Sequence, residues 1–276
     1  MTGFCPKGPL LALPVSHLMA QKSDYNQKLL DISDVLEIKS YPVPEWIPIN
    51  GPKVFHWDRG TCEDSFARDF PPLGQYLAQN PVDLFSFDLG PACALRKDIY
   101  PVSPVLSLDE ILDISRANLK LVRRFFSGNL AAENYNYFPT GLYENICEPE
   151  NISFLLDNLQ IDLVLDLAHA AVTAHNLGLN LESYLTGLPL NKVKEIHLSR
   201  PLIPDNPRAL ASDDHQCPRD GELNWLILAL ELLPQEARWP LVTIEYYKEQ
   251  PELLNIMTKT RQILKRYFEP GQKILN

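Results

Sequence analysis

The chain contains 276 residues, of which 45% are hydrophobic and 22% are charged, so it is long enough and apolar enough to bury a large core. Asp and Glu number 35 against 25 Lys and Arg, and the net charge of −10 disfavours a surface that neutralises the phosphates of DNA or RNA. Polar residues such as Asp166 and Glu231 interrupt the richest apolar stretches, so we expect no membrane span.

Short runs typical of strands alternate with amphipathic segments along the chain. We predict eight strands, at Leu10–Ser16, Val35–Ser40, Lys53–Trp57, Leu84–Leu89, Leu130–Glu133, Leu163–Leu167, Val193–Leu198 and Leu241–Tyr246. Helices are predicted near residues 24–32, 70–79, 107–126, 149–158, 170–186, 221–232 and 250–267. Eight strands with helical crossovers predict a single (β/α)8 barrel domain over residues 1–276, with a doubly wound open sheet as the alternative.

One connection, Pro201–Gly221, has no apolar periodicity, and we expect it to be a structureless excursion after the seventh strand. It carries Asp213, Asp214 and His215. Loops this long in compact domains are usually functional or disordered. We expect Asp214 and His215 to point into the mouth of the barrel, and a disordered surface loop is the alternative.

The cysteines indicate the redox environment. Five of them lie scattered at positions 5, 62, 93, 147 and 217, without a C-x-x-C pair. This pattern is typical of reduced thiols, and the weakly apolar start is short for a secretory signal, so we expect a cytoplasmic protein. Glycine-rich phosphate loops are absent from the sequence, and nucleotide cofactors are therefore not indicated.

The active site of a parallel barrel lies at the carboxyl ends of its strands, and here those ends are unusually polar. They carry His17, His56, Asp88, Glu133, Asp166 with His169, His197 and Glu245. Ionised carboxylates that meet in one mouth are costly without a cation. Among the basic residues, only Lys39, Arg59 and Arg200 are expected nearby, so the sequence predicts a bound metal.

Nine side chains are candidate ligands: His56, Asp88, Glu133, Asp166, His169, His197, Asp214, His215 and Glu245. One octahedral ion accepts about six donors, so either several of these residues bind substrate or the site holds two or three metals. Imidazole and carboxylate donors without cysteine suit iron or manganese better than structural zinc. The candidate catalytic residues are Glu133, Glu245 and His169, and Glu37 is a further candidate for a buried acid.

The order of these residues resembles the metal set of xylose isomerase-like barrels, a superfamily of sugar isomerases, sugar epimerases and endonuclease IV. In particular, the chain is similar to the multinuclear non-haem iron oxygenase family, to which the methanobactin-maturation oxygenase belongs. The similarity covers nearly the whole chain and is densest in Glu133-Asn134, Leu163–Asp166, Ala174–Asn176, Tyr184–Pro189, Glu195–Ser199 and Asp214-His215.

This resemblance implies a barrel that holds two or three iron ions. The positions that match the family's ligands are His56, Glu133, Asp166, His197, Asp214, His215 and Glu245. Two positions depart from the family pattern: Asp88 stands where a histidine is usual, and His169 stands where an asparagine is usual. Family members typically modify ribosomally made peptides, often at cysteine and often with a companion protein that presents the peptide. The resemblance therefore implies an iron-dependent oxidase or oxygenase that acts on a peptide.

Other functions stay open. A sugar isomerase or epimerase would bind one manganese, magnesium or cobalt ion and a small-molecule substrate, and Glu133 and Glu245 would move a proton at the carbon between them. A non-catalytic barrel that scaffolds a partner is disfavoured by the intact ligand set. An endonuclease would use similar metal chemistry, but the net charge of −10 opposes binding to a polyanion.

Overall fold

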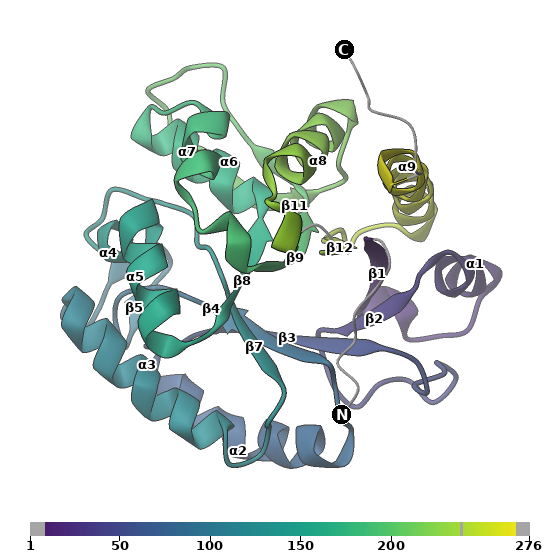
Figure 1. Cartoon of the computed structure of the whole chain (residues 1–276), viewed down its shortest axis with the longest axis horizontal. Helices are drawn as coiled ribbons and strands as arrows, with labels where there is room; N and C mark the ends of the chain where they lie inside the picture. The colour runs from purple at the N-terminus through teal and green to yellow at the C-terminus, as the bar shows by residue number, and fades with distance from the viewer. Residues whose placement is uncertain (1–8, 238–239, 269–276) are drawn as a thin grey trace.

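The computed structural model describes residues 9–237 and 240–268. Its centre is a closed barrel of parallel strands in the ring order β1-β12-β9-β8-β7-β4-β3-β2, with helices around the outside (Figure 1). The barrel strands are β1 (Leu10–Val15), β2 (Val35–Ile38), β3 (Lys53–Gly60), β4 (Leu84–Asp88), β7 (Asn129–Glu133), β8 (Asp162–Asp166), β9 (Val193–Leu198) and β12 (Leu241–Ile244). Each predicted strand overlaps one of these, so the predicted barrel is confirmed and the open sheet is wrong.

Helices cover the outside of the barrel. The α-helices are α1 (Asp24–Ile32), α2 (Asp64–Gln79), α3 (Leu108–Val122), α4 (Glu144–Cys147), α5 (Pro149–Leu159), α6 (Leu167–Leu177), α7 (Leu181–Gly187), α8 (Asp220–Leu232) and α9 (Gln250–Phe268). Short 3-10 turns are η1 (His17–Met19), η2 (Leu190–Lys192) and η3 (Gln235–Ala237). The short helix α4 was not predicted, and the bounds of the others agree with the predicted helices to within four residues except at two places.

The two exceptions have local causes. Helix α2 begins at Asp64, before the predicted start at residue 70, and Pro71 and Pro72 lie inside it. Proline is best tolerated in the first turn of a helix, which makes this stretch look like a helix start. The single helix predicted over 170–186 is instead two helices, because Gly178 adopts a left-handed φ of 70° that ends α6 and Asn180 caps α7.

Two antiparallel hairpins stand beyond the carboxyl ends of the barrel strands. The first pairs β5 (Arg96–Lys97) with β6 (Tyr100–Pro101), and the second pairs β10 (Arg200–Leu202) with β11 (Ser212–Gln216). The prediction that Pro201–Gly221 is structureless is therefore wrong. The error arises because the pairing of Arg200 with Gln216 joins residues far apart in sequence, which local periodicity does not detect.

Inward-facing side chains change from apolar to polar along the strands. Small apolar residues fill the amino-terminal part of the interior: Ala12, Val35, Val54, Leu84, Ala131, Val164 and Leu241. Two residues further along their strands, the inward positions are Glu37, His56, Ser86, Glu133, Asp166 and Thr243. The strand period of two thus brings polar side chains from neighbouring strands to one level inside the barrel.

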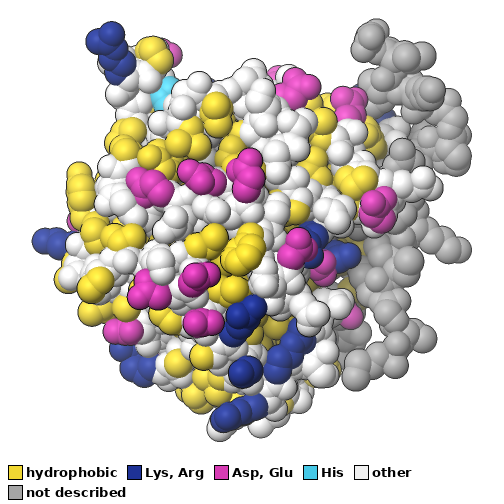
Figure 2. Space-filling view, turned by 60° about the vertical axis from the view of Figure 1, so that its left-hand side comes forward, with side chains coloured by type: hydrophobic (Ala, Val, Ile, Leu, Met, Phe, Trp, Pro, Cys, Tyr) yellow, Lys and Arg dark blue, Asp and Glu magenta, His cyan; other side chains and the backbone are white. Residues whose placement is uncertain are grey.

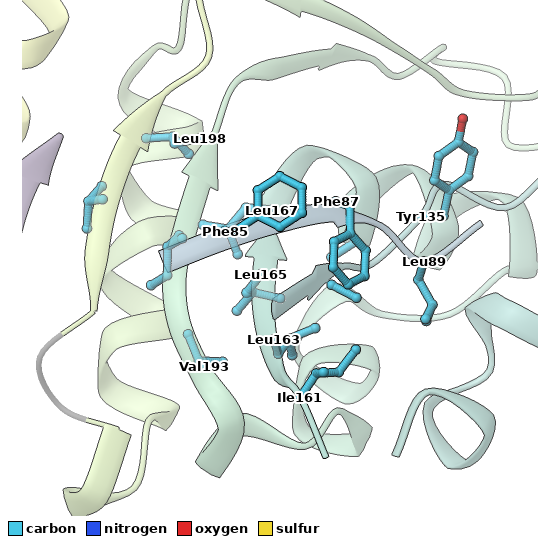
Figure 3. Packing of buried hydrophobic residues seen from close by; sticks show 14 of the residues in the cluster. Phe85, Phe87, Leu89, Tyr135, Ile161, Leu163, Leu165, Leu167, Val193 and Leu198 are labelled. Atoms are coloured by element: carbon cyan, nitrogen blue, oxygen red, sulfur yellow. The ribbon is translucent and has the colours of Figure 1, made fainter. Parts of the chain in front are cut away.

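The alternate positions point outward and form the main core. Phe85, Phe87, Leu163 and Leu165 are fully buried between the strands and the helices (Figure 3). Burying a side chain of this size stabilises the fold by about 1.5–3 kcal/mol. A shift of one residue in any strand would exchange the two faces, so this packing also fixes which side chains reach the interior.

The surface mixes charged and apolar side chains. On the face drawn in Figure 2, acidic side chains lie among apolar ones and basic side chains gather near the lower edge. Among the described residues, no helix combines the length and the apolar character that crossing a bilayer requires. Cys62, Cys93, Cys147 and Cys217 are free thiols, in agreement with the prediction, and Cys5 lies outside the described residues.

Gly60 provides a test of how the mouth of the barrel is packed. A Cβ atom at Gly60 would lie 1.9 Å from the carbonyl oxygen of Gly90, whereas a Cβ at Gly51 would meet nothing within 4 Å. We expect Gly60→Ala to lower the free energy of unfolding by about 1–3 kcal/mol, because backbone must move to relieve the clash. Urea unfolding measures this loss, with Gly51→Ala as the control. Equal stabilities of the two variants would contradict the described packing.

Candidate metal centre

A cavity of about 660 Å³ opens at the carboxyl ends of the barrel strands. Its polar lining comes from several elements that are far apart in the sequence: Lys39 after β2, His56 and Asp58 from β3, Asp88 from β4, Glu133 from β7, His169 from α6, Asp213 and His215 from β11, and Glu245 after β12. His17 lies exposed at the rim of the same cavity. The strand-end residues singled out in the sequence thus meet in one place.

Three sets of donor atoms lie close enough together to hold an ion. Within each set, the atoms lie within 4.8 Å of one another: Glu133, Asp166, His197 and Glu245 form one set, His56, Asp88 and Glu133 a second, and Glu37, His56 and His197 a third. The predicted proximity of Glu133, Asp166, His197 and Glu245 is confirmed. The sets share members: His56, Glu133 and His197 each belong to two of them.

Glu133 lies at the centre of these sets and is 2% exposed. Its Oε1 atom lies 3.3 Å from Nδ1 of His169 and 3.5 Å from Nδ1 of His197. Its Oε2 atom lies 3.1 Å from Nε2 of His56. The two carboxylate oxygens therefore face different imidazoles.

His197 is fully buried and presents each ring nitrogen to carboxylates. Its Nδ1 atom lies 3.4 Å from Glu245, on the same side as Glu133. Its Nε2 atom lies 3.0 Å from Glu37 and 3.6 Å from Glu195, and the latter carboxylate accepts a hydrogen bond from the Thr243 hydroxyl. Glu37 and Glu195 thus lie on the opposite side of the ring from Glu133 and Glu245, where carboxylates commonly orient metal-binding histidines.

Several buried polar atoms of this interior make no hydrogen bond within the part of the chain that the structure describes. They are both carboxylate oxygens of Glu37, Oδ2 of Asp166, Oε2 of Glu195 and both ring nitrogens of His197. The other oxygen of Asp166 accepts from the backbone N–H of His169 and caps α6, so the cap aims Oδ2 at the site. Buried polar atoms without hydrogen bonds are costly, and a cation beside the carboxylate oxygens and imidazole nitrogens would lower this cost. The donor set therefore fits a metal.

The electrostatics of the carboxylates differ from one position to the next. Burial raises the pKa of Asp88 to about 7, and the charge of Glu133 adds to the rise. Burial, together with Glu133 and against His169, raises the pKa of Asp166 to about 7. Burial also raises the pKa of Glu245, but Lys39 and His197 outweigh it and hold this pKa well below its usual range. Near neutral pH, protons thus compete with a cation at Asp88 and Asp166.

One of the three basic residues expected near the site is there. Lys39 pairs with Glu245 and, at 3.2 Å, with Glu37. Arg59 instead donates to the backbone of Asp58, and Arg200 donates to the carbonyl of Cys217 beside a different cavity. Lys39 and Arg96, which also lines this cavity, offset only part of the buried negative charge, which strengthens the argument for a cation.

The long connection folds back onto the cavity, as predicted, but with a different carboxylate. His215 Nε2 lies 3.4 Å from Glu245, and its Nδ1 lies 2.8 Å from Asp213. The Asp213 side chain is 7% exposed and also lies 3.6 Å from His169, whereas the Asp214 side chain is 49% exposed and pairs with Lys248. The prediction that Asp214 points into the mouth is wrong, because successive side chains of β11 alternate between its faces.

Four residues of the site were not among the predicted ligands: Asp58, Glu195, Asp213 and Tyr247. Asp58 lies 3.2 Å from His56, and the Tyr247 hydroxyl donates to Glu245. Asp58, Glu195 and Asp213 each stand two residues from a site histidine in the same strand. The strand period of two was therefore the signal in the sequence that could have identified them.

Comparison with protein families gives a match over most of the chain. The model of the family described as RiPP precursor modification enzyme MbnB/TglH/ChrH matches residues 73–267. This span contains the donors from Asp88 to Glu245, and His56 lies before it.

Shorter stretches match curated relatives. The UPF0276 protein of Vibrio parahaemolyticus is 28% identical over 96 residues, which is 35% of this chain and 33% of the relative. The UPF0276 protein of Paraburkholderia phytofirmans is 34% identical over 90 residues, which is 32% of this chain and 29% of the relative. The matched stretch thus spans about a third of the length of these relatives.

Solved structures share the fold at low sequence identity. The D-psicose 3-epimerase of Clostridium cellulolyticum H10 has a TM-score of 0.60 and 12% identity, over 92% of this chain and 99% of that one. A xylose isomerase domain-containing protein of Salmonella typhimurium LT2 has a TM-score of 0.63 and 10% identity, over 92% of this chain and 97% of that one. The fold is a xylose isomerase-like TIM barrel.

Asp213 and Asp214 are adjacent carboxylates of β11, and substituting each in turn gives a matched pair of variants. We expect Asp213→Asn to weaken metal binding by about tenfold or more, because Asp213 holds both His169 and His215, and residues that orient ligands have effects of this size. Asp214→Asn should bind metal as the wild type does. Titration of each metal-depleted protein with ferrous ion measures the affinities. A loss confined to Asp214→Asn would contradict the assignment.

Proposed function

Since the chain belongs to the family of RiPP precursor modification enzymes MbnB/TglH/ChrH, we propose that it is an iron-dependent oxidase or oxygenase that acts on a peptide. The observation that carries the proposal is the group of overlapping donor sets around Glu133 and His197, with buried donor atoms that lack hydrogen bonds. Overlapping sets of imidazole and carboxylate donors favour two or three iron ions over a single structural ion.

The proposal assigns roles to the residues of the cavity. Glu133 and His197 would each serve two donor sets, and Asp166 and Glu245 would complete the first of them. His169 lies beside Glu133 at the edge of the cavity, where it would act on the substrate or bind a further ion. Bound ferrous ions would supply the activation of O2, and O2 would accept the electrons removed from the peptide.

Access and orientation come from the loops around the mouth. Tyr135, Asn136 and Tyr247 line the cavity together with the donors and would contact the peptide. The hairpin that carries Asp213 and His215 closes one side of the cavity. A companion protein that presents the peptide is part of the same proposal, as the resemblance to the oxygenase family implies.

A single-metal sugar epimerase is the second candidate. Glu133 and Glu245 both lie near Nδ1 of His197, at 3.5 and 3.4 Å, and in this function the two carboxylates would move a proton at the sugar carbon between them. Epimerases also occur among the solved structures with this fold. The family match over residues 73–267 favours the peptide-modifying enzyme.

The number and identity of the bound metals separate these two functions. We expect protein purified without oxygen to contain two or more iron ions per chain, because one ion does not use all three donor sets. Elemental analysis of the purified protein measures the content. One manganese, magnesium or cobalt ion per chain and no iron would instead support the epimerase.

Substitution of the shared donors tests the centre itself. We expect Glu133→Gln and His197→Ala to lower the metal content and chelation of the wild type to lower its melting temperature, because a ligand that binds only the folded state stabilises it. At a free metal concentration a hundredfold above Kd, this stabilisation is about 2.7 kcal/mol.

His175→Ala is the matched control for these substitutions, because this histidine lies in α6 but contacts the carbonyl of Ala209 rather than the donor sets. Its metal content should equal that of the wild type. If both donor variants keep full metal content and chelation leaves melting unchanged, the cluster is a structural one and the proposal is wrong.

A further inference from the structure

A second cavity adjoins the metal centre. It has a volume of about 540 Å³, which is within the range of sites for small ligands. Arg96, Tyr135, Asn136 and Asp213 line both this cavity and the one that contains the donors. A substrate at the metal centre therefore has room to extend beneath the β5–β6 hairpin.

Arg96 is the cationic side chain in the lining of this second cavity, which the carboxylates Asp98 and Asp213 also line. Within the part of the chain that the structure describes, the one carboxylate that pairs with Arg96 is Glu63, at 3.7 Å from Nε. The guanidinium carbon lies 5.6 Å from the centre of the Tyr135 ring, and the side chain is 33% exposed. Lys39, in contrast, is bound between Glu37 and Glu245. Arg96 is thus the cation best placed to meet a ligand.

Tyr143 adds a second donor in the same cavity. The residue is fully buried, and its ring stacks on Tyr135 with centroids 5.8 Å apart. Tyr143 lines the cavity, its hydroxyl lies next to the Arg96 guanidinium, and this hydroxyl donates no hydrogen bond among the described residues. A buried hydroxyl without a partner is costly, and an anion held by Arg96 would accept its hydrogen bond.

We propose that Arg96 and Tyr143 bind a carboxylate of the peptide substrate in this second cavity, a proposal that rests on the proposed function. A guanidinium presents paired N–H groups that match the two oxygens of a carboxylate, and the tyrosine hydroxyl supplies a further donor. Phe138 and Ile99 line the same cavity and would contact the apolar part of the bound residue. The anchored carboxylate, from the peptide C-terminus or from an acidic side chain, would select which residue reaches Glu133 and His197.

Three small probes test the preference on the full-length, metal-loaded protein. N-acetyl-phenylalanine carries a terminal carboxylate, the α-amide of N-acetyl-aspartate carries only a side-chain carboxylate, and N-acetyl-phenylalanine amide carries neither. In ligand-observed NMR titrations, we expect at least one acid to bind about tenfold more tightly than the neutral amide. The tighter acid identifies the source of the carboxylate. Equal binding of all three probes would overturn the proposal.

Variants then locate the binding site. Arg96→Gln should abolish the preference for the acid, and the nearly isosteric Tyr143→Phe should reduce it. Lys97→Gln is the matched control, because Lys97 is the next residue of β5 and lines neither cavity. A preference that survives in Arg96→Gln would mean that the acid binds elsewhere, for example at the metals, and would overturn the proposal.

The metal content of the same preparations separates this inference from the proposed function. Arg96→Gln should contain as much metal as the wild type, because Arg96 belongs to none of the donor sets. Protein that lacks iron but keeps an Arg96-dependent preference would support the carboxylate subsite and contradict the oxidase. Protein that holds iron but shows no preference for the acid would support the oxidase and contradict the carboxylate subsite.

Discussion

The burial of five carboxylates inside the barrel is the constraint on which the rest of the structure depends. Glu37, Glu133, Asp166, Glu195 and Glu245 are each at most 3% exposed, and ionised groups so close together and so far from water repel one another strongly. Lys39 pairs with two of them and the imidazoles of His56, His169 and His197 approach the others, yet several oxygen and nitrogen atoms still lack a hydrogen bond among the described residues. The cluster is therefore stable as a set of ligands and unfavourable as a set of isolated acids.

The strands that bury these carboxylates also supply the hydrophobic packing that offsets the cost of burying them. In β4, Phe85 and Phe87 pack outward into the core while Ser86 and Asp88 face the interior. A one-residue slip would place phenylalanine in the cavity and a carboxylate in the core, so folding and site assembly depend on one register. Donors held on packed strands keep their positions before any ligand arrives, and such preorganisation is what a metal centre requires.

The strands and most donors were predictable because both depend on local sequence. Apolar runs identify the strands, and the polar residue that ends each run marks the mouth, as for Glu133 and Asp166. The choice of Asp214 over Asp213 failed because the register of β11 depends on its pairing with β10, a contact between distant residues. Arg96 was missed for a related reason: only the folded β5–β6 hairpin brings it beside Tyr135. Contacts made by inserted hairpins are not encoded in a periodic pattern.

The division of donors between barrel and hairpin has an evolutionary consequence. Donors such as Glu133 and His197 are tied to barrel closure, so mutations there are constrained by folding as well as by chemistry. Asp213 and His215 reside on an insertion outside the closed sheet, and a different insertion would leave the ring of strands intact. Exchange of this segment would therefore alter one side of the cavity and leave the strand-borne donors in place.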